Sequence, residues 1–142
     1  MADAPEPGAP GHEDVRAGAR LPPFTVPLTL QRRAMEAAAN RDFAPWHLDA
    51  AAPRASGAPD VFAGSTLVET LREAGIRSWC GSAARIMTLG FAIEDFGYVG
   101  EVVSAAGEVT GKRDGGLVEL DVWLQTARGR TVDESAALVF GR

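Results

Sequence analysis

The sequence predicts an α+β fold in which one long central helix is wrapped by a single antiparallel β-sheet. Three observations support this prediction. Residues 61–75 carry apolar side chains at helical spacing, and the chain after residue 84 alternates in the manner of strands separated by turn sequences. With 142 residues, 46% of them apolar, the chain can form one domain with a buried core.

The first 20 residues are predicted to be a disordered tail, and residues 21–142 to form the domain. Ala, Pro, Gly and charged residues dominate the tail, so it cannot bury enough apolar surface to offset the entropy lost on ordering. A short first strand is expected at residues 24–26, ended by Pro27.

A first helix is expected at residues 29–40. The segment contains strong helix formers, and Thr29 is a suitable N-cap. Leu30, Ala34 and Ala37 fall on one face, which predicts the buried side of this helix.

Residues 41–59 contain prolines and a glycine and are expected to form a loop with short turns. The long helix follows at residues 61–75, with Gly75 as its C-terminal stop.

Four strands of an antiparallel meander are predicted after the long helix, at residues 84–93, 101–110, 117–126 and 131–140. One helix covers only one face of such a sheet, so at least a dimer is expected.

The charge and cysteine content exclude several classes of function. The net charge is −5, and the basic residues are scattered, which argues against nucleic acid and anionic membranes as partners. Cys80 is the only cysteine, so an internal disulfide and a cysteine-based zinc site are excluded. No apolar run is long enough to span a membrane, and no signal peptide is evident, so a cytoplasmic protein is expected.

The candidate catalytic residues lie in the loop at residues 41–49. His12 falls in the predicted tail, so His47 is the histidine that the fold can position, and Asp42 and Asp49 are close to it in sequence. A carboxylate and an imidazole that share a water molecule can act as general base and then general acid, which is sufficient to add water to an activated double bond or remove it.

The start of the long helix is a candidate oxyanion site. Gly64 and Ser65 lie in its first turn, where amides have no intrahelical acceptor and the helix dipole is positive. A structural reading remains open, since a single loop histidine is more often a hydrogen-bonding residue, and Asp49 is expected to be a helix cap.

Other conspicuous side chains have structural interpretations. Trp79, Trp123 and Met87 are predicted to be core residues, whereas Arg32 and Arg33 are predicted to be ordinary surface charges.

Residues 40–49, 55–60 and 62–64 together resemble the MaoC-like (R)-specific enoyl-CoA hydratase/dehydratase family. The shared pattern is an Asp, four residues and a His, then an Ala/Gly-rich segment and a glycine at the start of the central helix. The resemblance implies a hotdog fold, a homodimer or a heteromer with another hotdog chain, and a substrate that is a thioester of coenzyme A or an acyl carrier protein. It implies no metal or other cofactor, water activation by Asp42 and His47, and binding of the thioester oxygen by the Gly64 amide.

The chain departs from the family pattern at two positions. Ala44 stands where the family often has Asn, and Ala63 stands where it often has His. These losses favour a bulky substrate, a related dehydration or isomerisation, or a site completed by a partner chain.

Three functions stay open on the sequence: a hydro-lyase, a non-catalytic or half-site subunit of a heteromeric hydratase, and a natural-product tailoring dehydratase or thioesterase. Hotdog thioesterases generally place an acidic residue on the central helix. Here Glu69 and Glu73 share a polar stripe with Arg72 and are expected at the surface.

Overall fold

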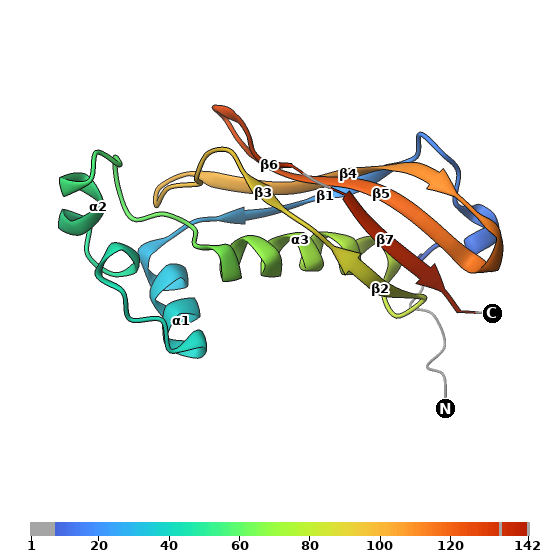
Figure 1. Cartoon of the computed structure of the whole chain (residues 1–142), viewed down its shortest axis with the longest axis horizontal. Coiled ribbons are helices and arrows are strands. Elements are labelled where there is room, and N and C mark those ends of the chain that lie inside the picture. The colour runs from blue at the N-terminus through green and yellow to red at the C-terminus, as the bar shows by residue number, and fades with distance from the viewer. Residues whose placement is uncertain (1–7, 134, 142) are drawn as a thin grey trace.

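The chain forms an antiparallel sheet with one long helix packed across it, as the sequence predicts (Figure 1). The computed structural model describes residues 8–133 and 135–141. Within them the sheet has seven strands: β1 (Arg20–Pro27), β2 (Ala84–Leu89), β3 (Ala92–Ile93), β4 (Val102–Lys112), β5 (Leu117–Thr126), β6 (Gly129–Asp133) and β7 (Ser135–Phe140). The main path is β1-β4-β5-β6-β3, and β7 joins β5 to β2.

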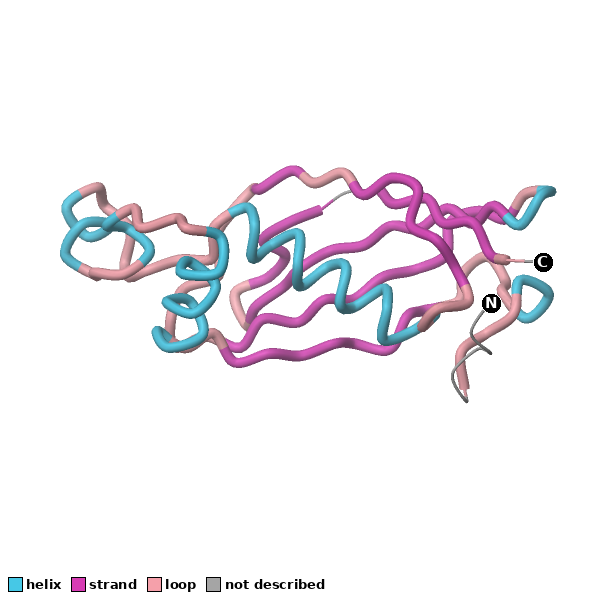
Figure 2. The backbone as a smooth tube through the Cα atoms, turned by 90° about the horizontal axis from the view of Figure 1, so that it is seen from below, coloured by secondary structure: helices cyan, strands magenta, loops and turns pink. Residues whose placement is uncertain are grey.

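The long helix, α3 (Ser65–Cys80), lies along one face of this sheet (Figure 2). Its buried apolar side chains recur about once per turn and face the strands, where they complete two core clusters; among them are Leu67, Val68, Leu71, Ile76 and Cys80. Since such spacing gives a helix one apolar stripe, a single sheet face is enough to bury it. At the C-terminus Gly81 has a φ of 53°, which stops the helix.

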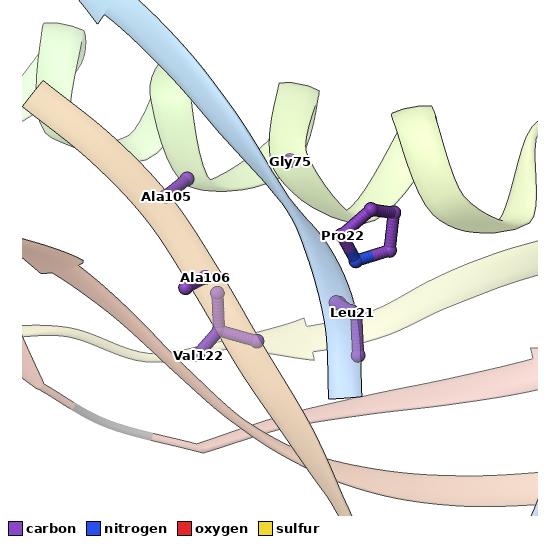
Figure 3. Close-up of a pocket in the computed structure, with 6 residues that line it drawn as sticks. All are labelled: Leu21, Pro22, Gly75, Ala105, Ala106 and Val122. Carbon is purple, nitrogen blue, oxygen red and sulfur yellow. The ribbon is translucent and has the colours of Figure 1, made fainter. Parts of the chain in front are cut away.

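The predicted boundaries of this helix are wrong at both ends. It begins four residues later than residue 61, and it runs through Gly75 to Cys80. Gly75 is an interior residue because β4 approaches the helix there: a Cβ at this position would lie 2.8 Å from the Cβ of Ala105. Figure 3 shows the apolar gap around Gly75, which is too small to hold a water molecule and contains neither Asp42 nor His47.

The first helix, α1 (Leu30–Asn40), begins where the sequence predicts. The Thr29 hydroxyl accepts a hydrogen bond from the amide of Arg32 at 3.1 Å. The prediction of its buried face is only partly correct: Ala37 is buried and Ala34 is half-buried, but Leu30 is 47% exposed and Arg33 is buried instead. The remaining short helices are η1 (His12–Asp14), η2 (Pro45–His47), α2 (Ala51–Ala55) and η3 (Asp114–Gly116).

The predicted simple meander is only partly correct. The hairpins that join β4 to β5 and β5 to β6 are confirmed. The single strand predicted at residues 84–93 is two strands with different neighbours, since β2 pairs with β7 and β3 pairs with β6. The stretch at residues 131–140 is likewise divided between β6 and β7.

Part of the predicted tail is packed against the domain. Residues 1–7 lie outside the described residues, but Val15 is 2% exposed within the core, and the amide of Gly18 donates to the carbonyl of Val109 at 2.8 Å. The packed chain therefore begins before residue 20.

Among the predicted core residues, Trp123 is buried and Trp79 packs against the core, but Met87 is 52% exposed. Arg72 is buried rather than exposed: its Nη2 donates to the carbonyl of Val122 at 3.1 Å, and its Nη1 donates to the carbonyl of Gly90. A buried guanidinium is tolerated there because backbone carbonyls replace its water.

Glu69 and Glu73 are exposed on α3, as the sequence predicts. None of the helices within the described residues is long and apolar enough to cross a membrane.

Candidate active site

The Asp42–His47 loop leaves α1 through one left-handed residue. Arg41 has a φ of 56°, and the amide of Asp42 donates to the carbonyl of Ala37 at 2.8 Å. This closes the helix, and the segment between α1 and α3 lies beyond the N-terminal end of α3 (Figure 1).

A single 3₁₀ turn then brings the imidazole back to the carboxylate. Pro45 occupies the first position of η2, and the amide of His47 donates to the carbonyl of Ala44 at 3.0 Å. As a result, His47 Nε2 lies 3.0 Å from Asp42 Oδ2. The two members differ in access, since His47 is 5% exposed and the Asp42 side chain is 41% exposed.

Two groups compete for the same nitrogen of His47. The indole Nε1 of Trp46 also lies 3.1 Å from His47 Nε2. Nε2 can donate to the carboxylate when it carries a proton, or accept from the indole when it does not, but it cannot do both. Whether Nε2 carries a proton therefore decides whether His47 binds Asp42 or Trp46. Both protonation states of the imidazole thus have a hydrogen-bond partner, which suits a residue that accepts and donates protons.

Burial is the main influence on the charge of His47. It lowers the pKa of the imidazole, the positive charge of Arg33 lowers it further, and Asp42 opposes both. The ring of Phe62 packs edge-on against the imidazole, with centroids 5.8 Å apart and planes inclined by 74°. The site thus favours an uncharged imidazole, the form that can accept a proton.

The start of α3 meets His47 directly. Gly64 is the N-cap, and a Cβ at this position would lie 3.0 Å from His47 Cε1 and 3.1 Å from Arg33 Nη2. No side chain caps the helix, so the amides of its first turn, including that of Ser65, keep their capacity to bind an oxygen atom. Ser65 is exposed and Gly64 is buried. The structure therefore brings Asp42, His47 and Gly64 together, with Ser65 next to them.

A buried ion pair behind the site was missed by sequence reasoning. Arg33, predicted to be a surface charge, is fully buried; its Nη1 pairs with Glu36 and its Nε donates to the carbonyl of Phe62 at 3.1 Å. The Thr66 hydroxyl on α3 donates to Glu36. The i, i+3 spacing of Arg33 and Glu36 is visible in the sequence, but it is equally typical of exposed helices.

Asp49 lies outside this cluster. Its Oδ1 accepts a hydrogen bond from the amide of Ala51, the first residue of α2, at 2.9 Å, but the N-cap of α2 is Ala50, so the predicted capping position is wrong by one residue. Across residues 8–133 and 135–141, no three His, Cys, Asp or Glu side chains gather closely enough to bind a metal ion.

A groove of about 530 Å³ runs between α1 and the first half of α3. Its volume is within the range of small-molecule sites. It does not contain Asp42 or His47, but Glu36 of the buried ion pair forms part of its wall. The lining residues are Thr29, Gln31, Arg32, Met35, Glu36, Leu67 and Thr70.

No model of a protein family matches this sequence. No curated protein matches it either.

Solved structures do match the fold over nearly the whole chain. A chain of the ChsH1–ChsH2 complex from Mycobacterium tuberculosis is 27% identical, with a TM-score of 0.83 over 89% of this chain and 98% of that one. The R-hydratase PhaJ1 from Pseudomonas aeruginosa is 19% identical, with a TM-score of 0.85 over 93% of this chain and 86% of that one.

The (R)-hydratase from A. caviae involved in PHA biosynthesis is 21% identical, with a TM-score of 0.82 over 91% of this chain and 99% of that one. The last two of these neighbours are named as hydratases, and this chain shares their architecture, a helix packed on an antiparallel sheet. The chain therefore has the hotdog fold.

Proposed function

We propose that this protein is a hydratase or dehydratase that adds water to an enoyl thioester, or removes it from a 3-hydroxyacyl thioester. The observation that carries the proposal is the Asp42–His47 pair, 3.0 Å apart, placed against the uncapped N-terminus of α3. The fold shared with the (R)-hydratases, and the Asp-x4-His spacing, support the same reaction. The substrate is a thioester of coenzyme A or of an acyl carrier protein.

The proton chemistry needs only the two side chains. Asp42 has the more accessible side chain and binds the water, while His47, hydrogen-bonded to Asp42, exchanges the proton with it. During hydration the pair removes one proton from water as its oxygen bonds to C3, and the pair then delivers a proton to C2. One O–H bond and the C2–C3 π bond are broken, and C3–O and C2–H bonds form, so no redox partner is required.

The negative charge that develops on the thioester oxygen is stabilised by the first turn of α3. The amides of Gly64 and Ser65 are the donors, aided by the positive end of the helix dipole. The glycine at position 64 leaves room for the imidazole, since a Cβ there would lie 3.0 Å from His47 Cε1.

The test follows loss of the enoyl-thioester absorbance band with crotonyl-CoA and with a longer or steroid enoyl-CoA. Asp42→Asn and His47→Gln should each reduce turnover by about 10²–10⁴-fold. Asp49→Asn is the matched control, since Asp49 is a carboxylate of the same loop whose hydrogen bond is to the amide of Ala51 rather than to His47. Near-normal rates in both site variants would overturn the assignment.

A half-site subunit is the second candidate. It is favoured by the match to a chain of a complex between two named components, and by exposed apolar side chains beside the site, Phe43 and Trp46 among them. A preparation that is inert alone and gains activity when mixed with a second hotdog chain, but not when that mixture contains Asp42→Asn, would establish this form of the function.

A further inference from the structure

Arg33 is a charged side chain that the fold places entirely out of water. Isolating a guanidinium from solvent is costly unless its donors are satisfied. Burial is also the main reason that the pKa of Arg33 is lowered, while the charge of Asp42 opposes this effect. The contacts of Arg33 must therefore offset the free-energy cost of its desolvation.

Two of the guanidinium nitrogens are held by a carbonyl just before Gly64 and by a carboxylate of α1. Nε donates to the carbonyl of Phe62 at 3.1 Å, and Nη1 pairs with Glu36. Glu36 is itself held by the Thr66 hydroxyl, so the ion pair connects α1 with the chain just before and just after Gly64. The guanidinium therefore has a fixed position relative to the start of α3.

The third nitrogen, Nη2, lies beside Gly64, near the imidazole. It is buried and has no hydrogen-bond acceptor within the part of the chain that the structure describes. Both Nη2 and His47 Cε1 lie within 3.1 Å of the point where a Cβ on Gly64 would be. The unpaired nitrogen of the guanidinium and the imidazole thus both border the space beside the same glycine.

We propose that Arg33 is a positioning residue for the Asp42–His47 pair, which fixes the imidazole against the start of α3 and keeps it uncharged. This inference rests on the proposed function for its catalytic meaning, but its physical content concerns His47 alone. A fixed positive charge beside the imidazole opposes a second positive charge on it, and the nearby carboxylate of Asp42 then remains the proton partner.

The charged groups that face His47 are Arg33 from α1 and Asp42 from the loop that follows it. The groups from η2 and from the segment before α3, the Trp46 indole and the Phe62 ring, are neutral. Replacement of Arg33 together with its ion-pair partner Glu36 should therefore raise the pKa of His47, since Asp42 would then be the remaining charge that acts on the imidazole.

The direct test is a proton NMR titration of the histidine Cε1–H signals. The chain has only two histidines, so His12 serves as an internal reference. The variant combines Arg33→Met with Glu36→Gln, which avoids leaving an unpaired buried carboxylate. Arg32→Met is the matched control, because Arg32 is the exposed neighbour on the same helix.

In the double variant the titration midpoint of His47 should move to higher pH, while that of His12 stays in place. Turnover of enoyl-CoA should fall most at acidic pH and recover as the pH is raised, a recovery that a merely structural role would not produce. Arg32→Met should leave the titration curves of both histidines unchanged. An unshifted His47 midpoint in a folded double variant would overturn the proposal.

Arg33→Lys provides a second test should the double variant fail to fold. It retains the charge but loses the guanidinium fork that reaches Phe62. The His47 midpoint should stay near that of the wild type while kcat falls, and wild-type kinetics at every pH would contradict the positioning role. The NMR titration needs no turnover, so failure of this inference is distinguishable from failure of the proposed hydratase activity.

Discussion

Gly64→Ala is the substitution that most directly tests the contact between the catalytic pair and α3. The added Cβ would lie 3.0 Å from His47 Cε1 and 3.1 Å from Arg33 Nη2, so its neighbours must retreat by a few tenths of an ångström. Both are buried, and the imidazole cannot retreat without disturbing its 3.0 Å approach to Asp42.

The expected loss can be estimated from that displacement. A misplacement of about 1 Å can cost about 10²-fold in rate, so a few tenths of an ångström should cost about tenfold in kcat/KM, or about 1.4 kcal/mol of transition-state stabilisation. The fold itself should be affected less, because replacing a glycine N-cap by alanine costs about 1 kcal/mol or less.

Gly75→Ala is the matched control on the same helix. Its Cβ would lie 2.8 Å from that of Ala105, so overpacking should cost about 1–3 kcal/mol, partly offset by about 1 kcal/mol of better helix propensity. Its unfolding temperature should fall, while kcat/KM per folded molecule stays at the wild-type value.

Enoyl-CoA turnover, measured well below the unfolding temperature of each variant, separates the two effects. Wild-type kcat/KM in Gly64→Ala would refute the contact between the helix start and the catalytic pair. An equal loss of activity in folded Gly75→Ala would show that the assay reports general packing rather than this contact.

Three further outcomes are expected. Arg128 holds the pKa of Glu101 below its ordinary value, which contributes stability at neutral pH that is lost as the pH falls through and below the carboxyl range. Arg128→Gln should therefore flatten the acid side of a plot of unfolding temperature against pH. An unchanged slope would contradict this. Because burial raises the pKa of the Cys80 thiol, iodoacetamide should label the native protein far more slowly than the protein in denaturant, and equal rates would show that the thiol is accessible. The lowered pKa of His47 means that the unfolded chain takes up a proton first as the pH falls below 6.5, so stability should decline there, and His47→Gln should remove that decline in a series of urea titrations.

Local features of this chain were predictable from sequence. The start of α1 at Thr29 depends on a side chain that caps the amide three residues later, and such short-range chemistry is visible in the sequence itself. The two hairpins after β4 and β5 were predictable for the same reason, since turn residues lie between alternating segments.

Features that depend on distant partners were not predictable. Gly75 was expected to stop α3, but it lies inside the helix because a strand some thirty residues later packs closely against it. The sequence predicts that Arg33 and Arg72 lie at the surface because charged side chains usually are exposed, and only the folded chain reveals the carbonyls that accept their hydrogen bonds.

The burial of Arg33 also helps to distinguish a structural role for this residue from a role in positioning His47. A buried ion pair is weak support for stability, since apolar residues of similar volume often stabilise a core equally well. Arg72 illustrates a structural alternative, because its nitrogens reach carbonyls of the sheet and the loop before β3, far from Asp42. Arg33 instead leaves Nη2 without an acceptor in the described chain, beside the same glycine that the imidazole borders. Desolvation of that nitrogen costs free energy that no hydrogen bond offsets. On the proposal made above, the guanidinium therefore acts on the charge and position of His47, the residue that transfers the proton.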